Sequence, residues 1–400
     1  MNLLMISLGN DISLGKGERT IKRHIKYARY SKIKIYMILL SPIKNIKSDK
    51  KISRDNCLFI FPVASQNHLL LILKGLIKTV KLCRKIKFNL IYSQDPFGTA
   101  LIGNLVRKIF KIPLLIGSHS SFANNKIWIN ERPIYFKFLL LMMRFNLPLG
   151  DAWRVNNHKE KEHYIKLYGI NPNRIKVNHT LVDIKTFTNT FKEKELKELK
   201  LEISKDLKTK LIIWVGRPVK FKRINLAIET FSEVIKNNPN TKLILIGNFI
   251  NSRIFKEAID NINPELKRNL YIVGNGCNHY DLSKFYKISD VFLHTSSYEG
   301  FGVVLSEAAL SGLPIVSTLS DGSLENVEHN KSGYLINSSS SKEIANYVLK
   351  LLNDDDLRIK MSNYAINMAI NKYDEEENLR TRDILWKNVA KGGLKSQENL

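Results

Sequence analysis

Short runs of apolar and β-branched residues alternate along the chain with longer segments in which apolar residues recur at helical spacing. This alternation is typical of parallel α/β units, in which each buried strand is followed by a helix that covers the sheet. A first series of strands is predicted at Leu3–Ser7, Ile33–Leu39, Leu58–Phe61, Leu90–Ser93, Leu114–Ser118 and Ala152–Val155, with helices between them such as Asn67–Ile86 and Thr99–Ile109.

The same alternation starts again in the second half of the chain. Strands are predicted at Leu211–Val215, Leu243–Ile246, Leu270–Val273, Val291–His294 and Ile315–Ser317, and helices at Ile224–Lys236, Ile254–Asp260, Leu282–Ile288 and Val303–Leu310. The chain therefore contains two doubly wound α/β series in tandem, and no shorter internal repeat is evident.

A Lys/Glu-rich segment, residues 191–208, separates the two series and lacks a strand signal, which indicates a surface helix or a linker. We therefore predict an N-terminal Rossmann-like domain at 1–190 and a C-terminal one at 205–375, as expected for a chain of 400 residues. Residues 376–400 would add a helix, whose apolar face could pack back on the N-terminal domain, and a frayed tail. Because such domains bind ligands at the carboxyl ends of their strands, we expect them to face each other across a cleft.

Charge is distributed very unevenly between the two halves. The net charge is +26, and residues 1–185 hold 33 Lys and Arg against 10 Asp and Glu, a net of +23. Codon bias toward Lys, Ile and Asn would affect both halves alike, so it does not explain this asymmetry. A basic face attracts polyanions, which leaves nucleic acid and an anionic membrane surface as candidate partners of the first domain.

Composition otherwise indicates a folded protein of a reducing compartment. The hydrophobic fraction is 44%, and Cys57, Cys83 and Cys277 stand far apart without the spacing of a zinc site. The first residues lack the basic region of a signal peptide, and the longest apolar stretches are far shorter than the roughly 20 residues of a membrane span. We therefore expect a cytoplasmic protein.

The most informative motif is the segment 296–317, which follows a predicted strand, passes through a glycine-rich turn and opens a helix. The free N–H groups at such a helix start form an anion site, and glycines let a phosphate or a sugar approach the backbone. Glu299 in the turn and Glu307 in the helix are eight residues apart and could accept hydrogen bonds from hydroxyl groups on both sides of a diphosphate. The alternative is a capped helix whose glutamates face solvent.

A second motif, Gly216-Arg217 followed by Lys222, stands at the end of the first strand of the second domain. A glycine turn with Arg and Lys on one loop suits a diphosphate, which Arg binds in a bidentate manner and Lys as a point charge. The alternative is a basic loop that binds no ligand.

At these two motifs together the sequence resembles glycosyltransferase family 4, the retaining GT-B enzymes also described as glycosyl transferases group 1. The resemblance extends over nearly the whole chain. It includes Asp321–Glu325 before a turn at Gly333–Leu335, and, in the first half, Tyr92–Phe97 and Gly117–Ser120.

The resemblance implies a role for each matching residue of the second domain. Arg217 and Lys222 would neutralise the diphosphate as it leaves, with Gly216 shaping their loop. Glu307 would bind the ribose hydroxyls. Glu299, Gly300 and the backbone of Phe301 and Gly302 would bind the donor sugar.

In the first domain the resemblance places His119 near the reacting carbon and the donor sugar, and Gln94 and Asp95 on the acceptor side. Gly9, after the first strand, would let its loop approach the diphosphate. The family's paired glycine is a single Gly9 here, with Gly15 and Gly17 further along, so which of these loops meets the donor stays open.

The run Asp354–Asp356 formally matches a metal-binding Asp-x-Asp motif, but it precedes a helical segment and is predicted to cap that helix. The resemblance implies a metal-independent reaction that needs no cofactor. The alternatives considered are a GT-B relative such as a sugar-nucleotide epimerase, and a basic nucleic-acid-binding protein. The latter lacks a nucleic-acid-reading motif and would leave the two glutamates unexplained.

The predicted helix Asn67–Ile86 interleaves leucines with lysines, a composition that suits the boundary between acyl chains and anionic headgroups. The alternative is a core-packed helix with a basic solvated edge. Since the first domain carries the acceptor in this fold, its charge predicts peripheral binding to the inner membrane face and a saccharide or lipid-linked acceptor. The donor base, the donor sugar and the acceptor are not readable from the sequence.

Overall fold

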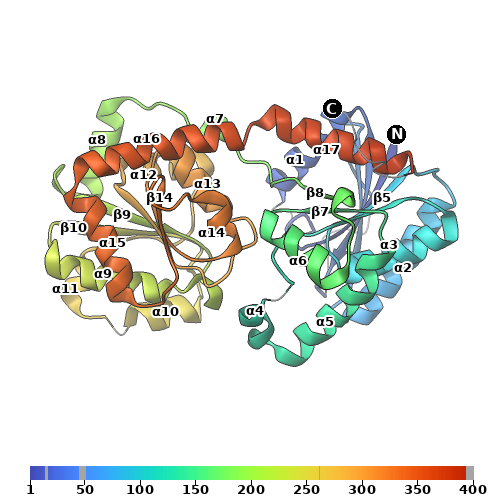
Figure 1. The fold of residues 1–400 in the computed structure, drawn as a ribbon, viewed down its shortest axis with the longest axis horizontal. Coiled ribbons are helices and arrows are strands. Elements are labelled where there is room, and N and C mark those ends of the chain that lie inside the picture. Colours follow the sequence, from blue (N-terminus) through green and yellow to red (C-terminus); the bar gives the residue numbers. More distant parts are fainter. Residues whose placement is uncertain (14–16, 45–50, 124, 261, 393–400) are drawn as a thin grey trace. The chain divides into compact units, whose positions relative to one another are not determined.

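The computed structural model describes residues 1–13, 17–44, 51–123, 125–260 and 262–392. The chain divides into two compact units, one formed by Met1–Leu181 with Glu376–Leu400 and the other by Val182–Glu375 (Figure 1). Gly15 and the tail 393–400, for which the sequence analysis made predictions, lie outside the described residues.

The N-terminal unit is built on an eight-stranded sheet in the order β3-β4-β2-β1-β5-β6-β7-β8, parallel throughout except at β3. Its strands are β1 (Asn2–Leu8), β2 (Lys34–Ser41), β3 (Ile52–Arg54), β4 (Leu58–Ala64), β5 (Leu90–Ser93), β6 (Leu114–Gly117), β7 (Ala152–Val155) and β8 (Ile175–Val177). Its helices are α1 (Glu18–Ser31), α2 (His68–Cys83), α3 (Gly98–Phe110), α4 (Lys126–Glu131), α5 (Pro133–Asn146), α6 (His158–Tyr168) and α17 (Glu375–Ala390), of which the last starts at the unit boundary.

The C-terminal unit is a six-stranded, wholly parallel sheet in the order β11-β10-β9-β12-β13-β14, with an apolar core on each face. Its strands are β9 (Lys210–Val215), β10 (Thr241–Ile246), β11 (Leu270–Val273), β12 (Val291–His294), β13 (Ile315–Thr318) and β14 (Gly333–Ile336). Its helices are α7 (Ile184–Phe187), α8 (Glu193–Ser204), α9 (Ile224–Asn237), α10 (Arg253–Asp260), α11 (Pro264–Arg268), α12 (His279–Ile288), α13 (Val303–Leu310), α14 (Asp321–Asn326), α15 (Ser341–Asn353) and α16 (Asp355–Lys372).

The C-terminal helix α17 completes the core of the N-terminal unit. Trp386 is 1% exposed, and its ring lies edge-on to Tyr27 at a centroid distance of 6.1 Å. Arg382 packs over the same Tyr27 ring and donates a hydrogen bond to the side chain of Asn178, just after β8. The last helix of the chain therefore stabilises the sheet formed by the first half.

All eleven predicted strands are present, and the described residues contain three further strands that were not predicted. β3 and β8 have only three residues each, too few for a pattern to be recognised. The turn predicted at Gly333–Leu335 is wrong, because these residues open β14, which pairs with β13. The strands come so close there that a Cβ at Gly333 would lie 2.0 Å from the carbonyl oxygen of Ile315, and only glycine fits.

The segment 191–208 forms α8 and belongs to the C-terminal unit. Ile203 is buried in the core of that unit, and Leu196 and Leu199 pack against it. The structural division comes at Leu181, and the segment acts as a packed helix because its apolar residues recur at helical spacing.

Candidate active site

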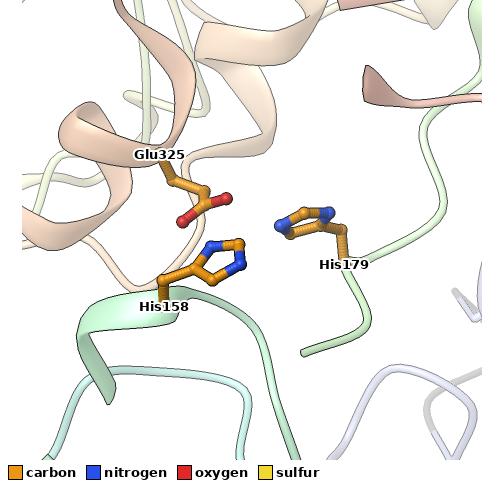
Figure 2. A group of neighbouring side chains, drawn as sticks. All are labelled: His158, His179 and Glu325. Atoms are coloured by element: carbon orange, nitrogen blue, oxygen red, sulfur yellow. The ribbon is translucent and has the colours of Figure 1, made fainter. Parts of the chain in front are cut away.

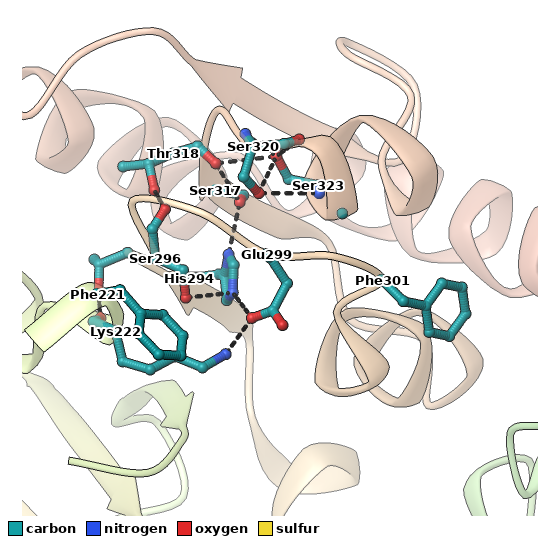
Figure 3. A network of polar contacts seen from close by, with 12 residues as sticks. Phe221, Lys222, His294, Ser296, Glu299, Phe301, Ser317, Thr318, Ser320 and Ser323 are labelled. Carbon is teal, nitrogen blue, oxygen red and sulfur yellow. Dashed lines mark hydrogen bonds and ion pairs between the residues drawn. The ribbon is translucent and has the colours of Figure 1, made fainter. Parts of the chain in front are cut away.

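The two motifs of the second domain meet at the carboxyl ends of β9 and β12. Lys222, in a short 3₁₀ turn (Lys220–Lys222) after β9, forms an ion pair with Glu299 in the loop after β12 (Figure 3). The side chains are 11% and 19% exposed. Taking two charges out of water is costly, and this pairing offsets the cost.

His294, at the end of β12, is the third charged or titratable group of this cluster. Its Nε2 lies 3.7 Å from Oε2 of Glu299, and its Nδ1 is 2.9 Å from the Ser317 hydroxyl (Figure 3). Burial lowers the pKa of His294, and the hydrogen bond with Glu299 offsets only part of this effect. This residue was not predicted, because a lone histidine that ends an apolar strand has the pattern of a core residue.

The environment of Glu299 fixes its charge. Burial alone would raise the pKa of the carboxyl group, but the charge of Lys222 and the hydrogen bond with His294 outweigh burial and lower it to about 2. Glu299 is therefore ionised at neutral pH and accepts hydrogen bonds without donating any.

Backbone contacts hold the two loops in place around the ion pair. The Ser297 N–H donates to the Phe221 carbonyl at 2.8 Å, and the Gly322 N–H donates to the Glu299 carbonyl at 2.7 Å. The rings of Phe221 and Tyr298 stack with centroids 4.4 Å apart. Each loop thus supports the other around the ion pair.

The glycine turn that follows Glu299 leads directly into α13. Gly302 has a φ of +76° and precedes the first residue of the helix, a conformation that L side chains rarely adopt. The Phe301 ring points away from Glu299 (Figure 3) and is 3% exposed, edge-on to Tyr373. The Phe301 side chain therefore belongs to the core, and its carbonyl accepts a hydrogen bond from the Asn326 side chain.

Glu307 is 3% exposed within α13, and its Oε1 lies 3.9 Å from Nε2 of His279. The neighbouring Tyr286 has its pKa raised by burial and further by the charge of Glu307. Because Glu299 and Glu307 are both largely buried, the alternative of solvent-facing glutamates is wrong. The structure places them in separate groups, and each has its own basic or imidazole neighbour.

Arg217 differs from the other predicted residues of this unit. Its side chain is exposed, and within the described part of the chain it makes no hydrogen bond or ion pair. Gly216 directly follows β9, and its N–H donates to the Ile246 carbonyl at 3.0 Å. Arg217 shares the loop of Lys222 but is not in contact with the Lys222–Glu299 pair.

In the N-terminal unit His119 follows β6, and its Nδ1 is 3.1 Å from the guanidinium of Arg154 on β7. Although part of the residue reaches solvent, protein atoms crowded around the ring and the charge of Arg154 hold the pKa of His119 well below its usual range. The imidazole is therefore neutral at pH 7. Gln94 follows the adjacent β5 and contacts Nε2 of His24 at 3.2 Å.

Two other predicted residues of the N-terminal unit have evident structural roles. Asp95 accepts a hydrogen bond from the Phe97 N–H at 2.8 Å and so organises the turn before α3. Burial raises the pKa of Asp95, although the hydrogen bonds from Thr99 and Phe97 partly offset this effect. Gly9 donates its N–H to the Leu40 carbonyl at 2.9 Å. A Cβ at Gly9 would have no described atom within 4 Å, so one side of this loop is open.

A pair of histidines that the sequence analysis did not single out lies near the end of the same sheet. His158 begins α6 and His179 follows β8, and their ring centroids are 6.4 Å apart (Figure 2). Glu325, also drawn there, belongs to the C-terminal unit, where its carboxylate is 3.0 Å from Nζ of Lys372.

The acidic run Asp354–Asp356 caps α16, as predicted. A side-chain oxygen of Asp354 accepts a hydrogen bond from the Leu357 N–H at 2.8 Å. Asp355 forms ion pairs with Lys210, at 2.9 Å, and with Arg358. The carboxylates of Asp354 and Asp355 are therefore engaged in structural contacts.

Two family models match the chain consecutively. Glycosyltransferase Family 4 covers residues 21–186, and Glycosyl transferases group 1 covers residues 196–368. The chain belongs to the glycosyltransferases of this family. It is a glycosyltransferase with the GT-B fold, as the resemblance had implied.

Individual relatives and solved structures agree with this family assignment. The D-inositol 3-phosphate glycosyltransferase of Corynebacterium efficiens is 25% identical over 292 residues, 72% of this chain and 68% of that protein. The capsular polysaccharide biosynthesis glycosyltransferase CapM of Staphylococcus aureus is 24% identical over 384 residues, 94% of each chain. Among solved structures, HepE of Anabaena in complex with UDP and glucose has a TM-score of 0.72 at 18% identity, covering 96% of this chain and 98% of that chain. Sucrose-phosphate synthase of Thermosynechococcus elongatus has a TM-score of 0.81 at 16% identity, covering 97% and 98%.

Replacing Lys222 by Met tests the electrostatics of the cluster. The folded-state pKa of Glu299, about 2 against an ordinary 4.5, means that the ionised pair contributes stability above pH 4.5, which is lost as the pH falls toward 2. The variant should lose on the order of 2–4 kcal/mol at pH 6, and this deficit should shrink at pH 3. Urea unfolding at both pH values measures it.

Lys331→Met, which removes an exposed ion pair with Glu328 in the same unit, is the matched control and should change little at either pH. A Lys222→Met deficit of the same size at pH 6 and pH 3 would contradict the assigned ionisation of Glu299.

Proposed function

We propose that this glycosyltransferase is a retaining enzyme that transfers a sugar from a nucleoside-diphosphate sugar to a saccharide or lipid-linked saccharide. The observation that carries the proposal is the buried Lys222–Glu299 pair beside the glycine-started helix α13. Family membership supports the retaining stereochemistry, and the UDP bound to HepE supports a nucleotide donor. We expect a role in the synthesis of cell-surface polysaccharides or glycolipids, as the names of CapM and of an α-monoglucosyldiacylglycerol synthase of Acholeplasma laidlawii suggest for those relatives.

The donor would lie along the carboxyl ends of β9 and β12. The N-terminus of α13 offers backbone N–H groups to its anionic or hydroxyl oxygens, since the first turn of a helix has no internal acceptors for them. Lys222, buried and paired with Glu299, would face the diphosphate, and the exposed Arg217 is free to turn toward it. Glu307 would accept hydrogen bonds from the ribose hydroxyls, and Glu299 from the donor sugar.

Catalysis would consist mainly of stabilising the leaving diphosphate. As the bond from the anomeric carbon to the phosphate oxygen breaks, negative charge grows on that oxygen, and fixed cations lower the barrier most where charge develops. The acceptor hydroxyl forms the new bond, and its proton passes to the departing phosphate or to solvent. A neutral His119 could donate or accept a hydrogen bond at a sugar hydroxyl without adding charge near the reacting carbon.

The first half of the chain carries a net charge of +23, which supports an acceptor that is presented on an anionic surface. We propose that the enzyme works on the cytoplasmic face of a membrane as a peripheral protein. Within the described residues, no helix combines the length and apolarity needed to cross a bilayer. Gln94, near His24 after β5, is the residue proposed to line the acceptor side, and Asp95 would shape its loop.

The reaction should not need a metal ion, because Lys222 and Arg217 would supply the positive charge at the diphosphate, and Asp354 and Asp355 already serve α16. Sugar transfer should therefore proceed at an unchanged rate after treatment with EDTA. Loss of turnover that Mg²⁺ or Mn²⁺ restores would contradict this part of the proposal.

Arg217→Ala and Lys222→Ala should each lower kcat by about two orders of magnitude or more, because each removes a charge that meets the developing negative charge. Lys220→Ala removes an exposed lysine of the same loop and is the control, with turnover expected near that of the wild type. Steady-state kinetics with the preferred donor measures all three, after circular dichroism has shown that each is folded. Near-normal turnover in both test variants would refute the proposed diphosphate site.

A further inference from the structure

Helix α5 presents apolar side chains to water along one whole side. Ile134 is 90% exposed, Phe145 68%, Phe138 56% and Leu141 51%. At about 100° per residue these four positions fall within an arc of about 60°. Met143, on the opposite side of the helix, is fully buried against the rest of the unit. The outward face is thus apolar like the inward one, whereas a typical surface helix turns polar residues toward water.

Helix α2 adds a second exposed apolar face to the same unit. Leu69 is 78% exposed and Leu73 52%, and both lie opposite the buried Leu71 and Gly75. The rings of His68, at the start of α2, and Tyr135, at the start of α5, have centroids 6.1 Å apart. Figure 1 shows α2, α3 and α5 grouped on this unit. We call the exposed apolar side chains of α2 and α5 the apolar patch.

The surroundings of the apolar patch are basic. Residues 56–94, which include α2, contain no Asp or Glu, and the exposed Lys74 and Lys81 lie beside its leucines. On α5, the exposed Lys137 and Arg144 flank the stripe from one side. Long basic side chains can extend alongside apolar groups and keep their charges at a polar boundary. A patch with apolar residues in the middle and cations at the rim matches a lipid surface with anionic headgroups.

We propose that the apolar patch inserts into the acyl boundary of an anionic membrane and thereby docks the N-terminal unit on the bilayer. Large apolar side chains gathered on one exposed helix face are unfavourable in water, and such faces often mark interaction sites. The proposal deepens the proposed peripheral membrane location by naming α5 as the principal inserting element. Ile134 and Phe138 enter the interface, and Lys137 and Arg144 pair with headgroup phosphates. The expected depth is shallow, since α5 lies along the surface and has only 14 residues.

The first experiment compares the full chain with Ile134→Glu/Phe138→Glu by co-sedimentation with vesicles. The vesicles are phosphatidylcholine alone, or phosphatidylcholine with about one third phosphatidylglycerol. Ile250→Glu/Ile359→Glu is the matched control, because these C-terminal residues are 60% and 55% exposed and the change of charge is equal. The wild type and the control should bind the anionic vesicles, whereas the α5 variant should partition at least about tenfold less.

The second experiment distinguishes insertion of the apolar patch from a purely electrostatic adsorption to the headgroups. Phe138→Trp places an extra fluorophore in the apolar patch, and acyl chains brominated near the headgroup should quench it more than they quench the native tryptophans. Ile359→Trp serves as the control and should show no added quenching. Equal vesicle binding by the α5 variant and the control, or a bound Phe138→Trp protein without added quenching, would overturn insertion.

Self-association is the remaining alternative occupant of the apolar patch. A wild-type chain that ignores both vesicle types, but forms a dimer that Ile134→Glu/Phe138→Glu abolishes in sedimentation velocity, would overturn the proposal in favour of a second copy. UDP and GDP binding is measured on every variant. Absence of nucleotide binding with intact vesicle binding would refute the proposed donor site and leave the membrane surface standing.

Discussion

The pairing of Lys222 with Glu299 is the interaction on which the candidate site depends. The two residues are 77 positions apart, and their side chains are largely buried, so each offsets the cost of burying the other's charge. Their contact fixes the loop after β9 against the loop after β12, and the Ser297 and Gly322 backbone hydrogen bonds extend this support. A preorganised cation beside a helix start is what stabilisation of a leaving diphosphate requires, because the site then needs no reorganisation during the reaction.

The surrounding fold provides the rigidity that this pair needs. Both sheets are almost wholly parallel, so the functional loops emerge together at the carboxyl ends of buried strands. In the N-terminal unit the same arrangement brings His119 and Gln94 to adjacent strands, and α17 returns from the end of the chain to close the core behind them. The candidate site residues thus stand on loops that follow the strands, and the apolar packing of the strands holds those loops in place.

Much of this could be predicted from the sequence, because parallel strands and their covering helices have distinct periodicities. The eleven predicted strands belong to this class, whereas the direct contact of Lys222 with Glu299 is known only from the structure. β14 was missed because a glycine needed for close strand pairing has the same local pattern as a turn. His294 was missed because its role comes from the three-dimensional neighbours Glu299 and Ser317, which no local pattern specifies. The exposure of the apolar residues of α5 could not be predicted either, since an apolar helix is expected to be buried unless its packing is known.

The central claim is that the C-terminal unit binds a nucleoside diphosphate through α13 and the glutamates around it. Calorimetric titration of UDP and GDP into the full chain and into Glu307→Gln tests it most directly. We predict that one of these nucleotides binds the wild type, and that the amide variant, still folded, binds it about tenfold more weakly or worse, because a neutral acceptor hydrogen-bonds ribose hydroxyls less strongly. No binding of either nucleotide by the wild type, or equal affinity in the variant, would contradict the account.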